Sequence, residues 1–338
     1  MKFSLVICTY MRPQSLIELL NSVEDQTVYP DEIIIVDGSR DNRTKQVLGQ
    51  NNFRNLYYHM VDDKDRGLTR QRNYGIGKTA DDIDVVCFLD DDIILEKTYF
   101  EELIKTYDLH KDALGVGGYI INEIKWHKVE ADSYKASRGE YFYDGFKRKD
   151  GSRFVLRKRL GLDTDVPPAC FPEFGHGRSV SFLPPSNKVY EVEQFMGGVS
   201  SYRKEVFDKI GFSHYFEGYG LYEDADFCFR LHKLGKQYVN TAARCEHHHH
   251  PSGRPDKFKY GKMVVLNGWY VWRVRHPNPS FKARFKWNFI SWLLTAIRFL
   301  NIVTTAKPKE AFMEALGRTS GWFKLIFKKP KTANAEQV

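Results

Sequence analysis

The segment DVVCFLDDDIILEKTYF, residues 84–100, joins a buried-strand pattern to three consecutive carboxylates. The apolar run at residues 85–89 is typical of a strand that is covered on both faces. Asp90, Asp91 and Asp92 follow directly, although adjacent like charges repel one another more strongly where water is excluded. If the extended geometry continues through residue 92, Asp90 and Asp92 point to one side. Asp91 then points to the other side, where we expect it to bond nearby backbone.

Two interpretations of this acidic triplet are open. Acidic residues favour helix N-termini, so the triplet alone favours a solvated turn before the helix predicted over residues 96–108. Alternatively, two converging carboxylates hold a divalent cation such as Mg²⁺ or Mn²⁺, which takes oxygen ligands and leaves positions open for phosphate. The remainder of the chain decides between the two.

Strand and helix patterns alternate ahead of this segment. Strands are predicted at residues 3–10, 31–37 and 55–61, and helices from Pro13 and over residues 67–80. This alternation predicts a mostly parallel α/β sheet, in which ligands bind beyond the carboxyl ends of the strands. Polar residues gather at those ends: Thr9, Tyr10, Asp37, Asp62, Asp63 and residues 90–92.

Residues 122–192 differ from their surroundings and are expected to form an insertion or lid. They are rich in Lys, Arg, Gly, Pro and aromatic side chains, with weak periodicity. Within them, FKRKDGSRFVLRKR, residues 146–159, predicts a hairpin with Asp150 and Gly151 at its turn. Residues 195–211 resume a strand–helix pattern, and residues 222–235 predict a helix.

The basic character of the chain lies in its last quarter. Residues 251–338 hold 17 Lys and Arg but 4 Asp and Glu, whereas residues 1–250 carry a net charge of −5. A basic tail suggests an anionic partner, which is a membrane, a nucleic acid or an acidic polymer.

A helix predicted over residues 287–303 is mostly apolar with one narrow polar stripe. A membrane span needs about 20 residues, and this helix is shorter and carries Arg298. We expect it to lie in a membrane interface with flanking cations on lipid phosphates; packing on its own domain is the alternative. The stripe consists of Asn288, Ser291, Thr295, Arg298 and Asn301.

The five cysteines are scattered and form no CxxC pair, which indicates reduced thiols. The opening MKFSLVICTY has too few apolar residues for a signal peptide. A cytoplasmic location is therefore expected, with peripheral contact to the cytoplasmic membrane face through residues 255–338.

A second acidic group consists of Glu223, Asp224 and Asp226. Acids in the first turn of a helix complement its dipole, which is the simplest explanation. The preceding residues 211–222 are rich in glycine and aromatic side chains, however, and suit the wall of a sugar site. A carboxylate there could serve as a general base.

Histidines and arginines give weaker signals. The run at residues 247–250 is an exposed polar loop when taken alone, and alternation lets at most two of its histidines meet one metal. Arg66, Arg70 and Arg72 suit a nucleotide or a diphosphate, but arginines on a helix are usually solvated.

The order of these motifs is more specific than any one of them. In succession the chain contains VICTYMRPQSLIELLNSVEDQT, IIIVDGSRDNRT, GLTRQRNYGI, FLDDDI, FMGGVSSYRKEVFDKIGF, GYGLYEDADFCFRLHKLG and ARCEHHHHPSGR. This succession resembles the family 2 glycosyltransferases, inverting sugar-nucleotide enzymes with the GT-A fold, over residues 3–254. The resemblance implies a Rossmann-like, mixed, mostly parallel sheet flanked by helices. Residues 1–121 would be its nucleotide-binding half, residues 193–254 its acceptor and catalytic half, and residues 255–338 a basic helical extension.

The resemblance also implies a role for single positions in the nucleotide site. Thr9, Tyr10 and Asp37 would line the base and ribose pocket, although the family's usual doubled aspartate is here VDGS. Asp90 and Asp92 match the DxD motif, in which the first approaches ribose and metal and the second binds metal. Further nucleotide-binding candidates are Arg12, Arg66, Arg70, Arg72 and Asp91.

The same resemblance assigns the catalytic side. Gly197 and Gly198 would let the backbone pass close to the donor sugar. Asp224 matches the base position, with Glu223 as the alternative, and His247 aligns with a late histidine near the metal. The implied cofactor is Mn²⁺ or Mg²⁺. The implied donor is a UDP-, GDP- or dTDP-linked sugar. The implied acceptor is a carbohydrate or lipid-linked hydroxyl in polysaccharide or glycolipid synthesis. No nucleic-acid partner is expected.

Two other functions compete with this one. A sugar nucleotidyltransferase needs a Gly-rich loop after the first strand, but CTYMRPQS at residues 8–15 contains no glycine, and no GxGxxG of a dehydrogenase follows. A non-enzymatic module that binds anionic surfaces would use the tail, whose Trp, Tyr and Arg could stack on bases. That module leaves the two acidic groups unexplained, since they repel phosphate unless a metal is bound.

Overall fold

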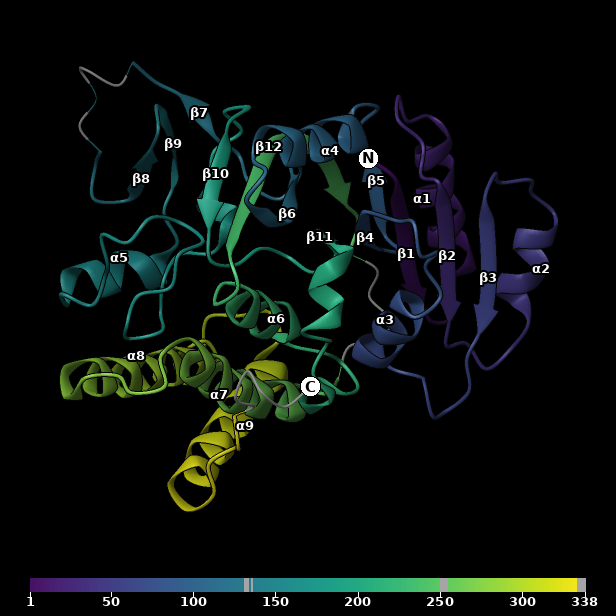
Figure 1. Cartoon of the computed structure of the whole chain (residues 1–338). Helices are drawn as coiled ribbons and strands as arrows, with labels where there is room; N and C mark the ends of the chain where they lie inside the picture. Colours follow the sequence, from purple (N-terminus) through teal and green to yellow (C-terminus); the bar gives the residue numbers. More distant parts are fainter. Residues whose placement is uncertain (131–133, 135, 250–254, 333–338) are drawn as a thin grey trace. The chain divides into compact units, whose positions relative to one another are not determined.

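The computed structural model describes residues 1–130, 134, 136–249 and 255–332 (Figure 1). The chain forms two compact units: residues 1–126 with 180–253, and residues 127–179 with 254–337. The expected insertion at residues 122–192 is thus divided between the units, with residues 127–179 grouped with the C-terminal helices. The division of residues 1–254 into functional halves stays a prediction.

The first unit is built on one nine-stranded sheet with the order β10-β12-β6-β11-β4-β1-β2-β3, to which β5 adds by pairing with β12. Parallel pairing joins β1 to β2 and β4, β2 to β3, and β6 to β12, while β5, β10 and β11 run antiparallel to their neighbours. The predicted mixed, mainly parallel sheet is confirmed. Its strands are β1 (Phe3–Thr9), β2 (Glu32–Asp37), β3 (Leu56–Met60), β4 (Val85–Asp90), β5 (Ile93–Leu95), β6 (Ala113–Ile120), β10 (Val189–Val192), β11 (Val199–Arg203) and β12 (Lys236–His247).

Helices flank this sheet, as Figure 1 shows for α1 and α3 beside the strands β1 and β2. The first begins at Pro13, whose fixed φ suits a first helical position, and buries its leucine face against the core. In α3, a side chain at Gly75 would collide with Val6 of β1, so the glycine permits close helix–sheet packing. The helical elements are α1 (Pro13–Glu24), α2 (Arg43–Gly49), α3 (Leu68–Ile76), α4 (Tyr99–Leu109), α6 (Glu223–Leu231) and the 3-10 turns η1 (Val180–Phe182), η2 (Lys204–Asp208) and η3 (His214–Phe216).

Strand register gathers the predicted polar residues at one edge of the sheet. Thr9 pairs with Asp37, and Cys8 pairs with Asp90, so three parallel strands end side by side. The antiparallel β11 starts at this same edge, where the backbone N–H of Asp90 donates to the carbonyl of Gly198 at 3.0 Å. The sheet alone therefore brings distant segments of the chain together.

The second unit contains a three-stranded sheet, order β7-β9-β8, and long C-terminal helices. The hairpin predicted at Asp150 and Gly151 is wrong, because the turn lies at Asp144 and Gly145, both with positive φ. Such a two-residue turn needs left-handed backbone at both positions, and Gly151 instead precedes a helix. The elements are β7 (His127–Lys128), β8 (Glu140–Tyr143), β9 (Phe146–Lys149), α5 (Ser152–Arg159), α7 (Lys257–Arg275), α8 (Phe281–Leu300) and α9 (Pro308–Phe327).

Helices α7 and α9 pack through glycines. A side chain at Gly261 would collide with the α9 backbone at Glu314, and one at Gly317 would collide with the α7 backbone at Phe258. Trp272 of α7 stacks on Trp287 of α8 with ring centroids 4.9 Å apart. Among the helices that the structure describes, none has the length and apolar character needed to cross a bilayer.

Candidate active site

The short strand β5 joins the acidic triplet to the histidine run. It begins at Ile93, directly after Asp92, and Ile93 pairs with His247 at the end of β12. As a result, His247 Nε2 lies 3.2 Å from Asp92 Oδ1. The backbone N–H of His248 also donates to the Asp92 carbonyl at 2.9 Å. Residues 155 positions apart in the sequence are thus fixed together by backbone pairing.

Asp90, Asp92 and His247 form a candidate metal site. Each offers one ligand atom, and these atoms lie within 4.8 Å of one another. Two carboxylates and an imidazole fit a divalent cation: oxygen suits Mg²⁺ and Mn²⁺, and imidazole suits the transition metal better. The other two described histidines of the run have different partners: His248 contacts Glu246 at 3.0 Å, and His249 contacts Glu123 at 2.9 Å.

Glu123 is a residue of this site that the sequence analysis missed. Its Oε1 lies 3.5 Å from His247 Nδ1, on the side of the ring opposite Asp92. With His249 the two form a second group of possible metal ligands. Burial alone would lower the pKa of His247, but Asp92 and Glu123 outweigh it and raise the pKa to about 9. The available signal was its place just beyond the carboxyl end of β6, which pairs in parallel with β12.

Asp91 lies apart from the candidate metal site. Its carboxylate accepts from Thr9 Oγ1 at 2.6 Å and from Arg12 Nη1 at 3.0 Å, so its partners are side chains and not the nearby backbone that we expected. Burial raises the pKa of Asp91 to about 6, against the opposing effects of Thr9 and Arg12. Arg12 Nη1 also lies 3.5 Å from Asp92 Oδ2. These contacts hold the turn between β4 and β5.

Arg72 links the two acidic groups. It is buried on α3, where Nη1 lies 2.5 Å from Glu223 Oε1 and Nη2 lies 3.5 Å from Asp90 Oδ1. The guanidinium rests on the rings of Phe88 and Phe212, with centroid distances of 5.7 and 5.1 Å. Burial raises the pKa of Glu223, and Arg72 opposes that shift. We treat Glu223 and Arg72 as an ion pair because their contact is short, at 2.5 Å.

Gly197 and Gly198 lie between these groups. A side chain at Gly198 would collide with the Asp90 carboxylate, and one at Gly197 would meet Glu223 Oε1 at 2.6 Å. Asp224, the second residue of α6, accepts weakly from the Gly197 N–H at 3.4 Å and from Ala225 N–H at 2.7 Å. The absence of side chains at these two glycines therefore lets the backbone pass directly against Asp90, Glu223 and Arg72.

The α6 acids differ in their surroundings. Asp226 is fully buried and bonds to Arg230 at 2.7 and 3.0 Å, so it has a structural partner on its own helix. Asp224 is half-buried, and burial raises its pKa. Of the two predicted base candidates, Glu223 is committed to Arg72, whereas Asp224 makes its described bonds to backbone N–H groups.

The remaining nucleotide-binding candidates lie around the strand ends. Asp37 is buried and accepts from Ser39 N–H and Tyr58 Oη, both at 2.8 Å. Tyr10 is exposed at the end of β1. Arg66 donates to the Gly38 carbonyl at 2.6 Å, and Arg70 contacts Glu217 at 2.6 Å. Their roles in nucleotide binding stay predictions.

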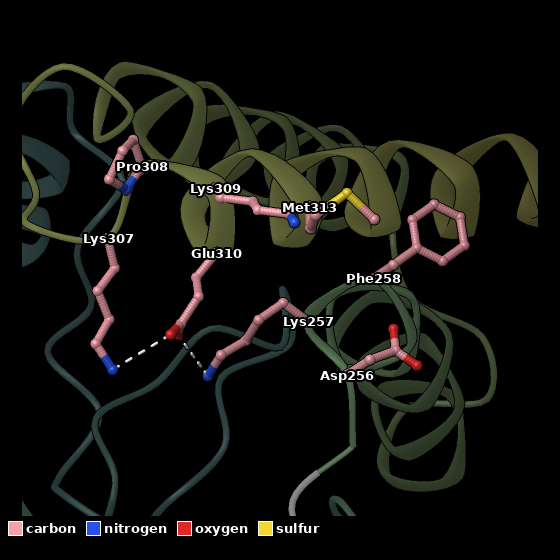
Figure 2. Close-up of a pocket in the computed structure, with 8 residues that line it drawn as sticks. All are labelled: Asp256, Lys257, Phe258, Lys307, Pro308, Lys309, Glu310 and Met313. Atoms are coloured by element: carbon pink, nitrogen blue, oxygen red, sulfur yellow. Dashed lines mark ion pairs between the residues drawn. The ribbon is translucent and has the colours of Figure 1, made fainter.

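A separate cavity of about 430 Å³ lies between the starts of α7 and α9 (Figure 2). Two of its three lysines, Lys257 and Lys307, pair with Glu310 at 3.4 and 3.2 Å. Its lining includes none of the predicted site residues. This cavity therefore does not bear on the chemistry at the sheet edge.

Two family models match the chain. Residues 4–166 match glycosyl transferase family 2, and residues 177–251 match the N-terminal domain of galactosyltransferase. The first region contains the acidic triplet and Arg72, and the second contains the paired glycines, the α6 acids and His247.

Similar curated proteins are transferases of sugars. The glucosyl-dolichyl phosphate glucuronosyltransferase of Haloferax volcanii is 34% identical over 133 residues, covering 38% of this chain and 42% of that protein. The O-antigen chain rhamnosyltransferase RfbN of Salmonella typhimurium is 33% identical over 95 residues, covering 28% of this chain and 29% of that protein. The chain thus spans less than half the length of these relatives.

One solved structure with a similar fold is GalNAc-T7 with UDP, GalNAc and Mn²⁺. It aligns with a TM-score of 0.50 and 15% identity, covering 88% of this chain and 58% of that chain. At this identity the likeness concerns the fold alone, and it is the GT-A fold.

Proposed function

We propose that the chain is an inverting glycosyltransferase, because residues 4–166 match glycosyl transferase family 2. It would move a sugar from a nucleotide diphosphate to a hydroxyl acceptor. The observation that carries the proposal is the convergence of Asp90, Asp92 and His247 at the sheet edge. The names of the curated relatives, both sugar transferases, support the same reaction class.

The metal is proposed to be Mn²⁺ or Mg²⁺, held by Asp90, Asp92 and His247. The imidazole favours Mn²⁺, and GalNAc-T7, which shares the fold, has Mn²⁺ and UDP in its structure. When bound, such a cation offsets the charge that develops on the departing diphosphate. UDP is therefore the first nucleotide to test, with GDP and dTDP after it.

The chain's own residues would divide the remaining work. Arg72, fixed between Asp90 and Glu223, adds positive charge beside the carboxylates that face the diphosphate. Asp224 would accept the proton of the attacking hydroxyl, since Glu223 is already paired with Arg72. Gly197 and Gly198, whose backbone passes directly against Asp90, Glu223 and Arg72, would let the backbone approach the donor sugar closely. One displacement at the anomeric carbon then inverts its configuration.

The acceptor is proposed to be a carbohydrate or a lipid-linked sugar in glycolipid or polysaccharide synthesis. The relatives named for glucosyl-dolichyl phosphate and for O-antigen chains support this class. A lipid-linked acceptor requires the enzyme to work at a membrane surface, which the net charge of +13 on residues 251–338 would favour. The five free cysteines support a cytoplasmic membrane face.

The experiment that tests the proposal is a thermal-shift screen of UDP-, GDP- and dTDP-sugars with Mn²⁺, compared with the same sugars in EDTA. A donor at 100 times its Kd adds about 2.7 kcal/mol of stability, which raises the Tm by several degrees. We expect such a shift for one nucleotide class, in the presence of cation only, together with slow release of the nucleoside diphosphate. If no sugar nucleotide shifts the Tm or is hydrolysed with Mn²⁺ present, the proposal is wrong.

A further inference from the structure

Helix α8 buries Ala283, Trp287, Ile290 and Ser291 and turns an aromatic face outward. Ser291, a member of the predicted stripe, is buried and lies 3.2 Å from His176 Nε2. Arg298, also of the stripe, pairs with the buried Glu314 of α9 at 2.7 Å. Asn288, another residue of the stripe, is exposed, so part of the predicted stripe lies on the outer side of the helix.

The outward face of α8 is a run of large aromatic rings. Phe281, Phe285 and Trp292 are 85%, 62% and 58% exposed, and Phe289 is also exposed. Their spacing of four, four and three residues places them on one side of the helix. Successive rings are in contact range, with centroids 6.0 Å apart for Phe285 and Phe289 and 6.3 Å for Phe289 and Trp292. We call these residues the aromatic face of α8.

Cations border the aromatic face on both sides. At 100° per residue, Arg284 lies on one side of the aromatic face, while Lys282 and Lys286 lie on the other. Arg284 and Lys282 are exposed. Soluble proteins expose single apolar side chains commonly, but a contiguous aromatic run usually marks an interaction surface. Aromatic rings flanked by Lys and Arg match a helix that lies in the headgroup region of an anionic bilayer.

We propose that the aromatic face of α8 docks on an anionic phospholipid bilayer, with its rings among the headgroups and Lys282 and Arg284 on lipid phosphates. Charge complementarity selects this partner, because residues 251–338 carry a net charge of +13. The helix lies flat, since its inward Arg298 and Glu314 pair could not remain paired if α8 left the bundle to cross the membrane. Docking would deliver the transferase to a lipid-linked acceptor, and this use of the surface rests on the proposed function. The docking itself does not depend on the proposed function.

The test is flotation of the full chain with vesicles, without donor or acceptor present. We compare phosphatidylcholine alone with phosphatidylcholine containing about 30% phosphatidylglycerol, at about 0.15 M salt. The full chain is expected to float with the anionic vesicles. The double variant Phe285→Ser with Trp292→Ser should lose on the order of tenfold in partition for each ring removed. The double variant Lys282→Glu with Arg284→Glu should weaken flotation with the anionic vesicles and leave flotation with the phosphatidylcholine vesicles unchanged.

A matched control is the double variant Tyr57→Ser with Leu109→Ser. These side chains are as exposed as those of α8, at 56% and 68%, but they belong to the first unit. We expect the control to float like the unchanged chain. Circular dichroism melting of both doubles checks that they are folded, and brominated lipids should quench Trp292 in the unchanged chain but give less quenching in Trp292→Phe.

Three results would overturn the docking proposal. The first is no flotation of the full chain with anionic vesicles, and the second is an equal loss in the α8 and control doubles. The third is a soluble dimer that Phe285→Ser with Trp292→Ser dissociates, because a second copy would then cover the face. Nucleotide-sugar binding measured in parallel separates these outcomes from failure of the proposed function, since the α8 residues are not in the candidate active site.

Discussion

The two acidic groups of the candidate site, residues 90–92 and 223–226, each contain three carboxylates, but the chain neutralises them differently. In the second group, Arg72 holds Glu223 at 2.5 Å and Arg230 holds Asp226 at 2.7 Å. In the first group, Arg12 holds Asp91 at 3.0 Å, whereas the guanidinium groups lie 3.5 Å from Asp90 and from Asp92. The imidazole of His247 lies 3.2 Å from Asp92. Asp90 and Asp92 therefore have the longer arginine contacts, which supports the proposal that they hold an added cation.

The largest effect that we expect from this comparison is a loss of turnover in Asp224→Asn. If Asp224 is the base, the variant keeps metal and donor binding but loses about 10²- to 10⁴-fold in transfer rate. Single-turnover transfer and donor affinity, measured on the same preparation, check this. Glu223→Gln serves as the comparison variant, because it removes the nearer of the two carboxylates that contact the buried Arg72 and should lower stability. The opposite pattern, a folded Glu223→Gln that cannot transfer and an active Asp224→Asn, would assign the base to Glu223.

Asp226→Ala should act on stability and not on chemistry. It leaves the buried Arg230 without its carboxylate, which costs about 3–5 kcal/mol in the free energy of unfolding. Urea unfolding measures the loss, with Asp81→Ala as the control, since the Asp81 side chain is fully exposed. A variant as stable as the control would show that Asp226 is not the structural member of its group.

Glu123→Gln should weaken the metal site without removing a proposed ligand. A carboxylate on the far nitrogen of a ligating histidine fixes its tautomer, and its loss typically costs 10- to 100-fold in metal affinity. Titration of Mn²⁺ by electron paramagnetic resonance gives this affinity directly. Glu246→Gln is the matched control, because Glu246 contacts His248 and not His247. Equal affinities in both variants would leave Glu123 without a positioning role.

The strand ends of the site could be predicted from sequence because they follow from local patterns. Buried runs before Thr9, Asp37 and Asp90 predicted parallel strands, and parallel strands end at one edge. Local patterns could not predict the proximity of Asp92 and His247, because it depends on the three-residue strand β5 and its pairing with β12, a strand far along the chain. The resemblance to a known family supplied that information in advance.

Other features could not be predicted because they depend on long-range packing. Glu123 looked like the start of an irregular insertion, and only the pairing of β6 with β12 brings it to His247. The hairpin turn was misplaced because Asp144-Gly145 and Asp150-Gly151 offer the same turn chemistry. For α8, the polar stripe was visible in the sequence, but nothing local fixed which face packs inward.

The proposed metal site is tested most directly by calorimetric titration of Mn²⁺ into the unchanged chain and into Asp92→Asn, each with and without UDP. We expect one Mn²⁺ bound per unchanged chain, tighter with UDP present, and a loss of Mn²⁺ affinity on the order of 100-fold or more in Asp92→Asn. Circular dichroism melting of both proteins checks that the variant is folded, since it loses the charge that faces His247 and Arg12. Equal Mn²⁺ binding in the two proteins would contradict the central proposal that Asp90, Asp92 and His247 hold a cation.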